Sequence, residues 1–527
     1  NNGDGVYIAG FSSAKFTNCN ISDNGLNGIV VWSESSVELV NTTFAKNGHY
    51  GIRMQGDLAP KSITVSNSIF YDNTSASIRS DNGITDIVNV AYTYSDDAFE
   101  QISSVVTFNS ENLYDSSVNV KFVEEEVGNY HLVASSFLVN GGHPDSTDAN
   151  GTRADLGAFP YESPDLDTWY VSTTGNDTTG FGSLTSPLSS IQGAINLGDH
   201  GDSIIVGPGT YYENIVVRGE NITVTGSGWA NTTLDAGGNG SGIVVTDLES
   251  FNYNHGEVDT FRLKDMAIIN GTGTQDYTNP SGTNDPFGGA VYVFESVAQI
   301  SDVTLSGNTA SVGGALAAQD ASIVIDNTFM FDNTATSKGS AIWFRAGDLV
   351  INNSVINDNH YAGGSEWFWD NASALALSSG RFRLVNNTIA NNHGYPIWAF
   401  DQNPKVLVAN SILTWHDGQG GRPYFTPTSQ VNAYFFNNII KTGINTGGVF
   451  NDSTFATSFA NYYFEPSFID TAGGDYRLSD QSVAISSGRN SLGSGLTMPY
   501  VNLPGGSTDG MDSFFYFDVS GEDVNGN

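Results

Sequence analysis

The chain has 527 residues, more than one ordinary core can hold, so it forms about two to four domains or grows as a solenoid by adding turns. Its formal charge is −37, from 19 Lys+Arg against 56 Asp+Glu, which excludes nucleic acid as a favourable partner because phosphate binding needs cationic side chains. Aromatic residues make up 12% of the chain and exclude a disordered protein, and no apolar run approaches the roughly 18 residues of a membrane helix.

Residues 1–80 repeat one pattern three times. Glycine-led apolar strands at 5–8, 28–31 and 51–54 lie 23 residues apart, and between them runs a phrase N-x-x-h-x-x-N, where h is apolar. Short runs rich in Val, Ile and Phe, bounded by Gly, Asn, Asp and Ser, indicate strands. No hairpin dipeptide separates equivalent strands, so each is expected to pair in parallel with its equivalent one period later. The pattern predicts a parallel β-helix.

The asparagines of the phrase have a structural role in such a coil. Corners between short strands need left-handed or bridge conformations, which Asn, Asp and Gly tolerate best. Asparagines at the same corner of successive coils can also form a hydrogen-bonded ladder along the stack. We therefore expect turns and ladders from Asn18, Asn41 and Asn67 and from their partners six residues later.

The same phrase recurs between residues 288 and 413. Its first positions, from Asp302 to Asn410, are separated by 25, 26, 33 and 24 residues, which is a fixed period with one insertion at 360–370. A period of this length predicts stacked units. Loops that lengthen out of a regular solenoid are frequent places for function.

Two passages between the repeats look like the end and the start of a coil. Residues 128–132 and 145–159 resemble the C-terminal close, and residues 169–177 and 186–211 the N-terminal opening, of the right-handed parallel β-helix (pectate-lyase-like) superfamily, found in large secreted bacterial proteins. In that opening a short helix plugs the first coil, and Pro187 with Ile191, Ala194 and Ile195 fits such a helix. Residues 465–478 echo the first close.

The resemblance implies an all-β fold with two right-handed β-helices in tandem. We predict a first domain at 1–162, which lacks its N-terminal coils and ends in a closing segment, a linker at 163–168, and a second domain at 169–527. Within the second domain we predict a capping helix at about 187–197, coils at about 203–440 and a closing segment at about 460–527.

Catalytic members of the superfamily hold their residues on the outward side of one stacked sheet. Alternation along the glycine-led strands of the second domain assigns Val291, Leu316, Ile342, Leu375 and Ile397 to the inside. Tyr292, Trp343, Trp398 and Phe400 then point outward, next to Trp367 and Trp369 of the insertion. These rings either stack on sugars as a ligand-binding face or pack under the insertion or against another protomer.

The constellations that sugar lyases and hydrolases need are not legible in the sequence. A lyase needs an acidic Ca²⁺ cluster with a Lys or Arg base, and a hydrolase needs converging carboxylates. If the aromatic face borders a catalytic groove, the first acid or base candidates are Arg345, Glu366, His393 and Asp401. Epimerases of the superfamily carry Asp and His in a strand that here reads Tyr50 to Gly56 and holds neither.

A structural Ca²⁺ ion is one further expectation. Asp145, Asp148, Asn150 and Asp155 supply several oxygen ligands in eleven residues, although they do not match the EF-hand pattern. Asp518, Glu522, Asp523 and Asn525 form a similar group near the end of the sequence. The alternative for both groups is a set of acidic turns in contact with solvent.

Two functions remain open at this point. The first is a structural or surface-display segment of a secreted or cell-surface bacterial protein, without turnover, that associates with itself or with further β-helix domains, with end-to-end assembly into a filament as its extension. The second is a polysaccharide-binding or polysaccharide-degrading module that uses the aromatic face. The acidic composition suits an extracellular, Ca²⁺-containing location.

Overall fold

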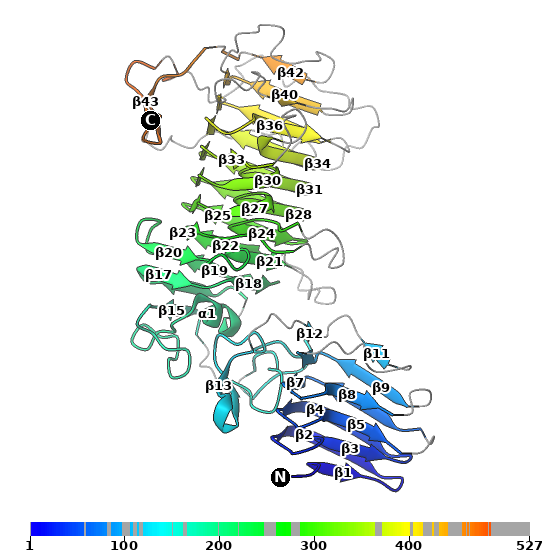
Figure 1. Cartoon of the computed structure of the whole chain (residues 1–527). Helices are drawn as coiled ribbons and strands as arrows, with labels where there is room; N and C mark the ends of the chain where they lie inside the picture. Colours follow the sequence, from blue (N-terminus) through cyan, green and yellow to red (C-terminus); the bar gives the residue numbers. More distant parts are fainter. Residues whose placement is uncertain are drawn as a thin grey trace. The chain divides into compact units, whose positions relative to one another are not determined.

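The structure, a computed structural model, shows an all-β chain wound into coils (Figure 1). It describes residues 2–56, 60–81, 86–96, 106–108, 113–114, 120–149, 151–161, 166–198, 200–219, 221–246, 260–275, 285–363, 372–400, 404–414, 424–425, 432–440, 456–459, 461–462, 464–482 and 484–485. The chain divides into two compact units, 1–204 and 205–527, and each is described here by itself. The coils are those of a right-handed parallel β-helix, as the sequence predicted.

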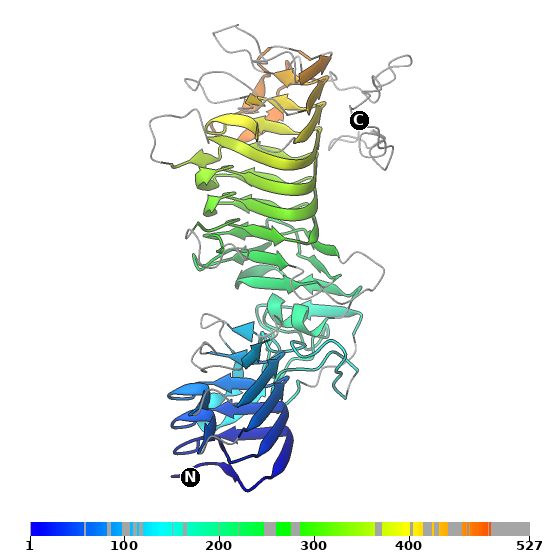
Figure 2. The ribbon, with the colours of Figure 1, turned by 90° about the vertical axis from the view of Figure 1, so that its right-hand side faces the viewer.

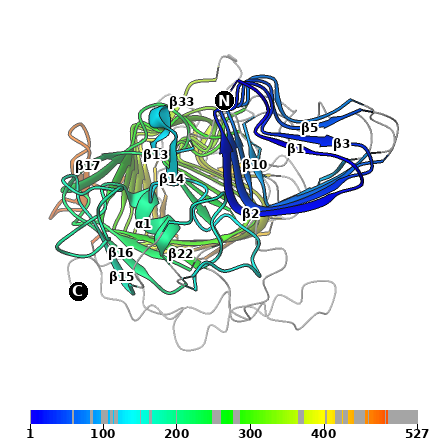
Figure 3. The ribbon, with the colours of Figure 1, turned by 90° about the horizontal axis from the view of Figure 1, so that it is seen from below.

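The first unit stacks equivalent strands in parallel, in the register that the 23-residue spacing predicted. Val6 pairs with Ile29, and Ile29 pairs with Ile52. Seen from below, β1, β3 and β5 lie over one another (Figure 3). The glycine-led sheet contains β1 (Val6–Ile8), β3 (Ile29–Trp32), β5 (Tyr50–Gln55) and β8 (Ala76–Ser80). The other walls contain β2 (Ser13–Ser22), β4 (Ser36–Ala45), β6 (Ser62–Ser66), β7 (Ile69–Tyr71), β9 (Ile87–Ala91), β10 (Tyr94–Ser95), β11 (Val106–Phe108) and β12 (Leu113–Tyr114).

The second unit has three walls. Its glycine-led sheet contains β18 (Ile215–Arg218), β21 (Ile243–Thr246), β24 (Val291–Phe294), the first halves of β28 (Leu316–Asp326), β31 (Ile342–Asn352) and β34 (Ser373–Val385), then β36 (Tyr395–Phe400) and β39 (Tyr424–Phe425). The middle sheet contains β19 (Thr223–Thr225), β22 (Thr260–Lys264), β25 (Val297–Ser301), the second halves of β28, β31 and β34, then β37 (Lys405–Ala409), β40 (Asn432–Phe436) and β42 (Ala456–Phe459).

The third wall, which we call the asparagine sheet, is formed by the strands inside the N-x-x-h-x-x-N phrase. It contains β17 (Gly209–Tyr212), β20 (Thr232–Asp235), β23 (Ala267–Ile269), β26 (Thr304–Ser306), β29 (Phe329–Phe331), β32 (Val355–Asn357), β35 (Thr388–Ala390), β38 (Ile412–Leu413) and β41 (Ile439–Ile440). A short extra sheet pairs β27 (Thr309–Val312), β30 (Thr334–Lys338) and β33 (His360–Tyr361). Figure 2 shows the successive coils of this unit edge on.

The glycine that leads each strand is required by a close approach between coils. A Cβ atom on Gly28 would lie 2.6 Å from the carbonyl oxygen of Gly51, and one on Gly314 would lie 2.3 Å from that of Ser340. Heavy atoms cannot approach so closely, so only glycine fits these positions. The repeat of glycine in the sequence is thus a repeat of one backbone contact.

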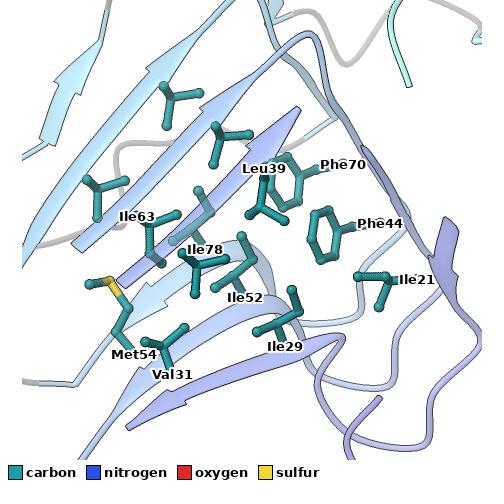
Figure 4. Packing of buried hydrophobic residues seen from close by; sticks show 14 of the residues in the cluster. Ile21, Ile29, Val31, Leu39, Phe44, Ile52, Met54, Ile63, Phe70 and Ile78 are labelled. Carbon is teal, nitrogen blue, oxygen red and sulfur yellow. The ribbon is translucent and has the colours of Figure 1, made fainter. Parts of the chain in front are cut away.

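The core of each coil is a column of side chains from equivalent positions. In the first unit Ile29, Ile52 and Ile78 lie one above another, and the rings of Phe44 and Phe70 stack with centroids 4.8 Å apart and planes 7° apart (Figure 4). In the second unit the positions predicted to point inward, from Val291 to Ile397, are at most 1% exposed. The side chains that alternate with them, from Tyr292 to Trp398, belong to a separate apolar cluster, as the alternation predicts.

Each position of the asparagine phrase has a separate role. The first residue, such as Asn327 or Asn353, has a positive φ, 44° and 49° in these two cases, and turns the chain at the corner. The middle residue, such as Met330, is fully buried in the core. The last residue is a buried ladder asparagine: Asn308 Nδ2 donates to Asn333 Oδ1 at 3.0 Å, and Asn333 Nδ2 to Asn359 Oδ1 at 2.9 Å.

Residues 130–204 of the first unit join a closing segment to a short helix, α1 (Ile191–Leu197), which was predicted at about 187–197. Asn196 Nδ2 of α1 donates to the carbonyl oxygens of Ala134 at 3.0 Å and Ser136 at 2.8 Å. β15 (Thr168–Val171) and β16 (Ser203–Val206) flank the helix in the chain. These contacts hold the helix to the closing segment, and the boundary between the two compact units accordingly falls within β16. The predicted domain limits 1–162 and 169–527 stay predictions, and so does the capping role of the helix.

We expect the ladder to carry much of the stability of the second unit. Replacing Asn333 by Ala removes the acceptor of the backbone N–H of Asn308 and the side-chain donor to the carbonyl oxygen of Leu305, which should lower the free energy of unfolding by about 3 kcal/mol. The control is Asn386→Gly, which keeps the left-handed corner and removes one exposed hydrogen bond, at a cost below about 1 kcal/mol. Denaturant titration measures both, and equal losses would contradict the ladder.

The closing segment of the first unit offers a second test. Gly157 and Gly151 have almost the same φ, 93° and 92°, but a Cβ on Gly157 would lie 2.4 Å from Ile69 Cδ1, whereas one on Gly151 meets nothing within 4 Å. Gly151→Ala should cost about 1–2 kcal/mol of backbone strain, and Gly157→Ala about 1–3 kcal/mol more from overpacking. Thermal denaturation compares them; a smaller loss for Gly157→Ala would show that the closing segment does not pack on β7.

Candidate functional site

The outward side of the glycine-led sheet in the second unit carries a regular row of side chains. Strand register places Tyr292, Ala317, Trp343, Ala376 and Trp398 opposite one another on successive strands. Large rings therefore alternate with alanine. Because neighbouring strands are only about 4.8 Å apart, the alanines leave the room that the rings of the next strands occupy.

This aromatic row is buried. Tyr292 is fully buried, Trp343, Trp398 and Phe400 are 7%, 6% and 5% exposed, and all four belong to one apolar cluster. Phe287, which precedes β24, covers part of it, with its ring centroid 5.6 Å from that of Tyr292 and 5.2 Å from that of Trp343. Of the two alternatives for these four rings, the structure shows packing. Ligand binding by them stays a prediction that requires the cluster to open, and Trp367 and Trp369 lie outside the described residues.

One end of the row has a cation over two rings. Trp398 and Phe400 stack with centroids 4.3 Å apart, and Lys338 Nζ lies 5.0 Å from the Phe400 centroid and 5.8 Å from that of Trp398. This is a cation–π arrangement between the extra sheet and β36. Among the described residues, the buried Nε1 of Trp398 has no hydrogen-bond acceptor. The arrangement holds the covering strand against the row.

Of the predicted acid and base candidates, the structure describes Arg345 and His393, and these two lie apart. Arg345 is exposed and pairs in register with Ser378 on the next strand, which in turn pairs with Phe400. Its guanidinium group lies 3.9 Å from the carboxylate of Asp320, which is a distant ion pair. His393 is half-buried and lies edge-on to Tyr361, two residues before β36 begins. Because Phe400 ends that strand, Arg345 and His393 are separated by at least about 16 Å of strand length. Glu366 and Asp401 lie outside the described residues.

The outward positions of the described glycine-led strands also lack carboxylates. Among the strands from β18 to β36, the charged residues at these positions are Arg218 and Arg345. Two converging acids, which hydrolysis of a sugar bond needs, are therefore not found on this part of the described face.

Two of the predicted calcium ligands, Asp148 and Asp155, accept backbone hydrogen bonds within the closing loop. Asp155 is buried and its two carboxylate oxygens accept backbone N–H groups, from Asn140 at 2.6 Å and from Tyr161 at 2.5 Å. Asp148 Oδ2 accepts the N–H of Asp155 itself at 2.8 Å. Burial raises the pKa of Asp155 to about 7. Asp155 thus organises the closing loop.

Metal binding at this loop is otherwise open. Within the described residues no group of three or more His, Cys, Asp or Glu side chains is placed to hold a metal. Asn150 and the second predicted group, Asp518 to Asn525, lie outside those residues. Calcium binding by Asp145, Asp148, Asn150 and Asp155 stays a prediction, which a Ca²⁺ titration followed by thermal denaturation tests.

Both units share a tyrosine contact that sequence reasoning did not find. In the first unit the hairpin of β13 (Phe122–Glu124) and β14 (Asn129–Leu132), joined by the 3₁₀ turn η2 (Glu125–Val127), places Tyr130 Oη 3.2 Å from Asp23 Oδ2. In the second unit the hairpin of β43 (Phe468–Asp470) and β44 (Asp475–Leu478) places Tyr476 Oη 2.9 Å from Asp358 Oδ2. The tyrosines reach back 107 and 118 residues along the chain.

The two contacts are equivalent in detail. Asp23 and Asp358 both have a positive φ and follow a strand at the corner, β2 in one unit and β32 in the other. Each tyrosine ring is buried and packs edge-on against a phenylalanine of its own hairpin. Tyr130 meets Phe122 and Tyr476 meets Phe468, in both cases with ring centroids 5.3 Å apart. Burial, together with the neighbouring aspartate, raises the pKa of both tyrosines. The sequence signal was present, in the echo between residues 128–132 and 474–478, but it does not show the partner.

The tyrosine contacts predict a loss of stability at alkaline pH. Because the native pKa is raised, the stabilisation is complete below the ordinary value of 10.0 and is lost as the pH rises above it, where the unfolded chain ionises first. The double variant Tyr130→Phe, Tyr476→Phe should be less stable at pH 7 by roughly 1–3 kcal/mol per hydrogen bond. The gap to the wild type should narrow between pH 10 and 12 in denaturant titrations; a constant gap would contradict this.

With the geometry in place, comparison with known proteins gives the class. The family model for the right-handed β-helix region matches residues 1–112 and 288–469, more than half of the chain. The chain belongs to the right-handed β-helix family. No curated protein matches it.

Three similar solved structures are a pectate lyase and two pectin methylesterases. Pectate lyase Pel9A has 15% identity and a TM-score of 0.36, with 63% of this chain and 93% of that chain covered. The pectin methylesterase PemA from Erwinia chrysanthemi has 14% identity and a TM-score of 0.29, with 57% and 81% covered. The pectin methylesterase from Aspergillus niger has 16% identity and a TM-score of 0.29, with 56% and 91% covered. Likeness at this level assigns no activity to this chain.

Membrane insertion through a helix is not found. Among the residues that the structure describes, no helix combines the length and the apolar character needed to span a bilayer.

Proposed function

We propose that this chain is a structural, surface-display β-helix segment of a secreted or cell-surface bacterial protein. The observation that carries the proposal is the packed outward row from Tyr292 to Trp398, which fills the face where an enzyme of this architecture would need an open groove. The described outward positions of the same face hold no carboxylate pair, and Arg345 lies in register with Phe400, at the opposite end of β36 from His393.

Charge supports an extracellular location. A chain with 56 acidic and 19 basic side chains has a strongly negative surface field, which favours solubility. Divalent cations outside the cell screen such a surface, and Ca²⁺ bound by Asp145, Asp148, Asn150 and Asp155 is part of this proposal. The same field disfavours polyanionic partners that have no bridging cation.

The proposed partner is another β-helix coil, from the same protein or from a second copy. The strands of successive coils pair in parallel, as β1 does with β3 and β2 with β4. A coil of another copy, or of a further β-helix domain, can add to such a stack through the same backbone hydrogen bonds. End-to-end assembly into a filament is the extension of this proposal.

A second candidate is polysaccharide binding or cleavage at the aromatic row. It is favoured by the buried Nε1 of Trp398, which lacks an acceptor that a ligand hydroxyl could supply. In this candidate the cluster opens, and Arg345, Glu366, His393 and Asp401 are the acid and base residues to test, in a lyase or a glycoside hydrolase.

One experiment separates the two functions. The purified chain is incubated with pectate, alginate, chondroitin and neutral polysaccharides, with and without Ca²⁺, and unsaturated products and new reducing ends are measured. We expect neither product, and we expect ordered end-to-end assemblies in electron micrographs. A product that appears with the wild type and is lost in Arg345→Ala, but not in the control Arg477→Ala in the closing hairpin, would overturn the structural function.

A further inference from the structure

The asparagine sheet of the second unit carries an exposed tryptophan on a loop that backbone hydrogen bonds fix. The loop precedes β20, and its Gly226 and Gly228 N–H groups donate to the carbonyl oxygens of Lys264 and Asp265, each at 2.9 Å. Gly228 has φ 100°, and its own carbonyl oxygen accepts the N–H of Thr232 at 2.9 Å. Trp229 follows Gly228 and is 54% exposed. A large ring is thus presented to solvent by a backbone that is already ordered.

The tryptophan ring extends across the sheet to a second exposed ring. The Trp229 and Phe329 centroids are 6.4 Å apart with planes 44° apart, and Phe329 is 39% exposed. Register places Ala267 and Thr304 on the two strands before Phe329, at the same outward position. These two small residues are only 8% and 7% exposed. Because Ala267 and Thr304 are small, they leave space on the outer side of the sheet for the larger rings, which lie along the coil axis.

Polar groups border the rings on one side. Asp302 and Asn327 are the corner residues two positions before Thr304 and Phe329, and Asn327 Nδ2 donates to Asp302 Oδ1 at 2.6 Å. Both side chains are only partly buried and keep free hydrogen-bonding capacity toward solvent, since a carboxylate accepts several bonds. Two rings with an adjacent carboxylate and amide form a surface that is apolar on one part and hydrogen-bonding on the next.

We propose that Trp229 and Phe329 are a binding platform for a neutral polysaccharide chain, with Asp302 and Asn327 at its hydroxyl edge. A pyranose ring has an apolar face that stacks on an aromatic ring and a rim of hydroxyls that needs polar partners, which is the division seen here. The charge of −37 and the carboxylate at the edge repel uronates, sulfated sugars and nucleic acids, whereas a neutral glycan meets no such repulsion. Little ordering is needed on binding because the loop is fixed.

This platform is distinct from the buried row on the glycine-led sheet and does not rest on the proposed structural function. A display segment that assembles into a filament can bind a glycan along its side, and one that does not assemble can bind it too. Binding here and assembly are therefore measured separately.

The test uses affinity electrophoresis of the whole chain in gels that contain soluble xylan, glucomannan or hydroxyethyl cellulose, with polygalacturonate as the charged comparison. We expect retardation by at least one neutral polysaccharide and none by polygalacturonate. Trp229→Ala and Phe329→Ala should each weaken that binding at least tenfold. The matched control is Tyr212→Ala, which removes a ring that is 77% exposed on the same sheet, in β17, and should leave the retardation unchanged.

Two binding results overturn the proposal: no retardation by any neutral polysaccharide, or a loss of binding in Tyr212→Ala equal to that in the two ring variants. A wild-type dimer in sedimentation velocity that Trp229→Ala dissociates also overturns it, because the platform would then be a contact between copies. Because either ring variant could lose structure, circular dichroism and the melting temperature of each are compared with the wild type. The variant Trp229→Phe, which keeps a stacking ring on the same loop, should retain most of the binding.

Discussion

The structure depends on hydrogen bonds that run along the stack, from each strand to its equivalent one coil later. Their spacing of about 4.8 Å brings every side chain into contact with the residue at the same position of the next coil. A buried position must therefore hold a group that tolerates its own copy above and below. Asn333 meets this condition because its amide donates to Asn359 and accepts from Asn308, whereas an aspartate could not donate and a leucine would remove the hydrogen bonds to the backbone of Leu305 and Asn308.

The same spacing limits aromatic residues, and the two units meet the limit in two ways. Inside the first unit, Phe44 and Phe70 occupy successive coils by lying flat on each other at 4.8 Å. On the outward row of the second unit, the indoles of Trp343 and Trp398 are too wide to occupy neighbouring strands, and Ala376 lies on the strand between them. A row with a ring on every second coil leaves no room for a ligand between the rings. The alternation therefore reads as a packing pattern, which agrees with the burial of these side chains.

The sequence could predict the features that recur in every coil of the stack. The 23-residue spacing defines the register of Val6 with Ile29, and the first Asn of each phrase defines the left-handed corner, because both recur in every coil. The exposure of Trp343 could not be predicted, since Phe287, which covers it, belongs to no repeat. The same holds for Tyr130 and Tyr476: their phrase is visible twice, but Asp23 and Asp358 look like any other corner residue until the hairpin is seen to fold back. Of the acid and base candidates that the structure describes, Arg345 lies in register with the last residue of β36, whereas His393 precedes its first residue, and the sequence alone does not give this arrangement.

This difference indicates where recognition is to be sought in a β-helix. A residue that obeys the period is constrained by its copies, and a change there affects the stack before it affects a ligand. A residue on an interruption has no copy and can be chosen for another purpose. Trp229 lies on such an interruption, on a loop fixed by Lys264 and Asp265, and its ring is kept exposed although burying it would have been favourable. Trp229 and Phe329 together present a pair of exposed rings on this ordered part of the molecule, so the interrupted side of the asparagine sheet is the surface on which a ligand is to be expected.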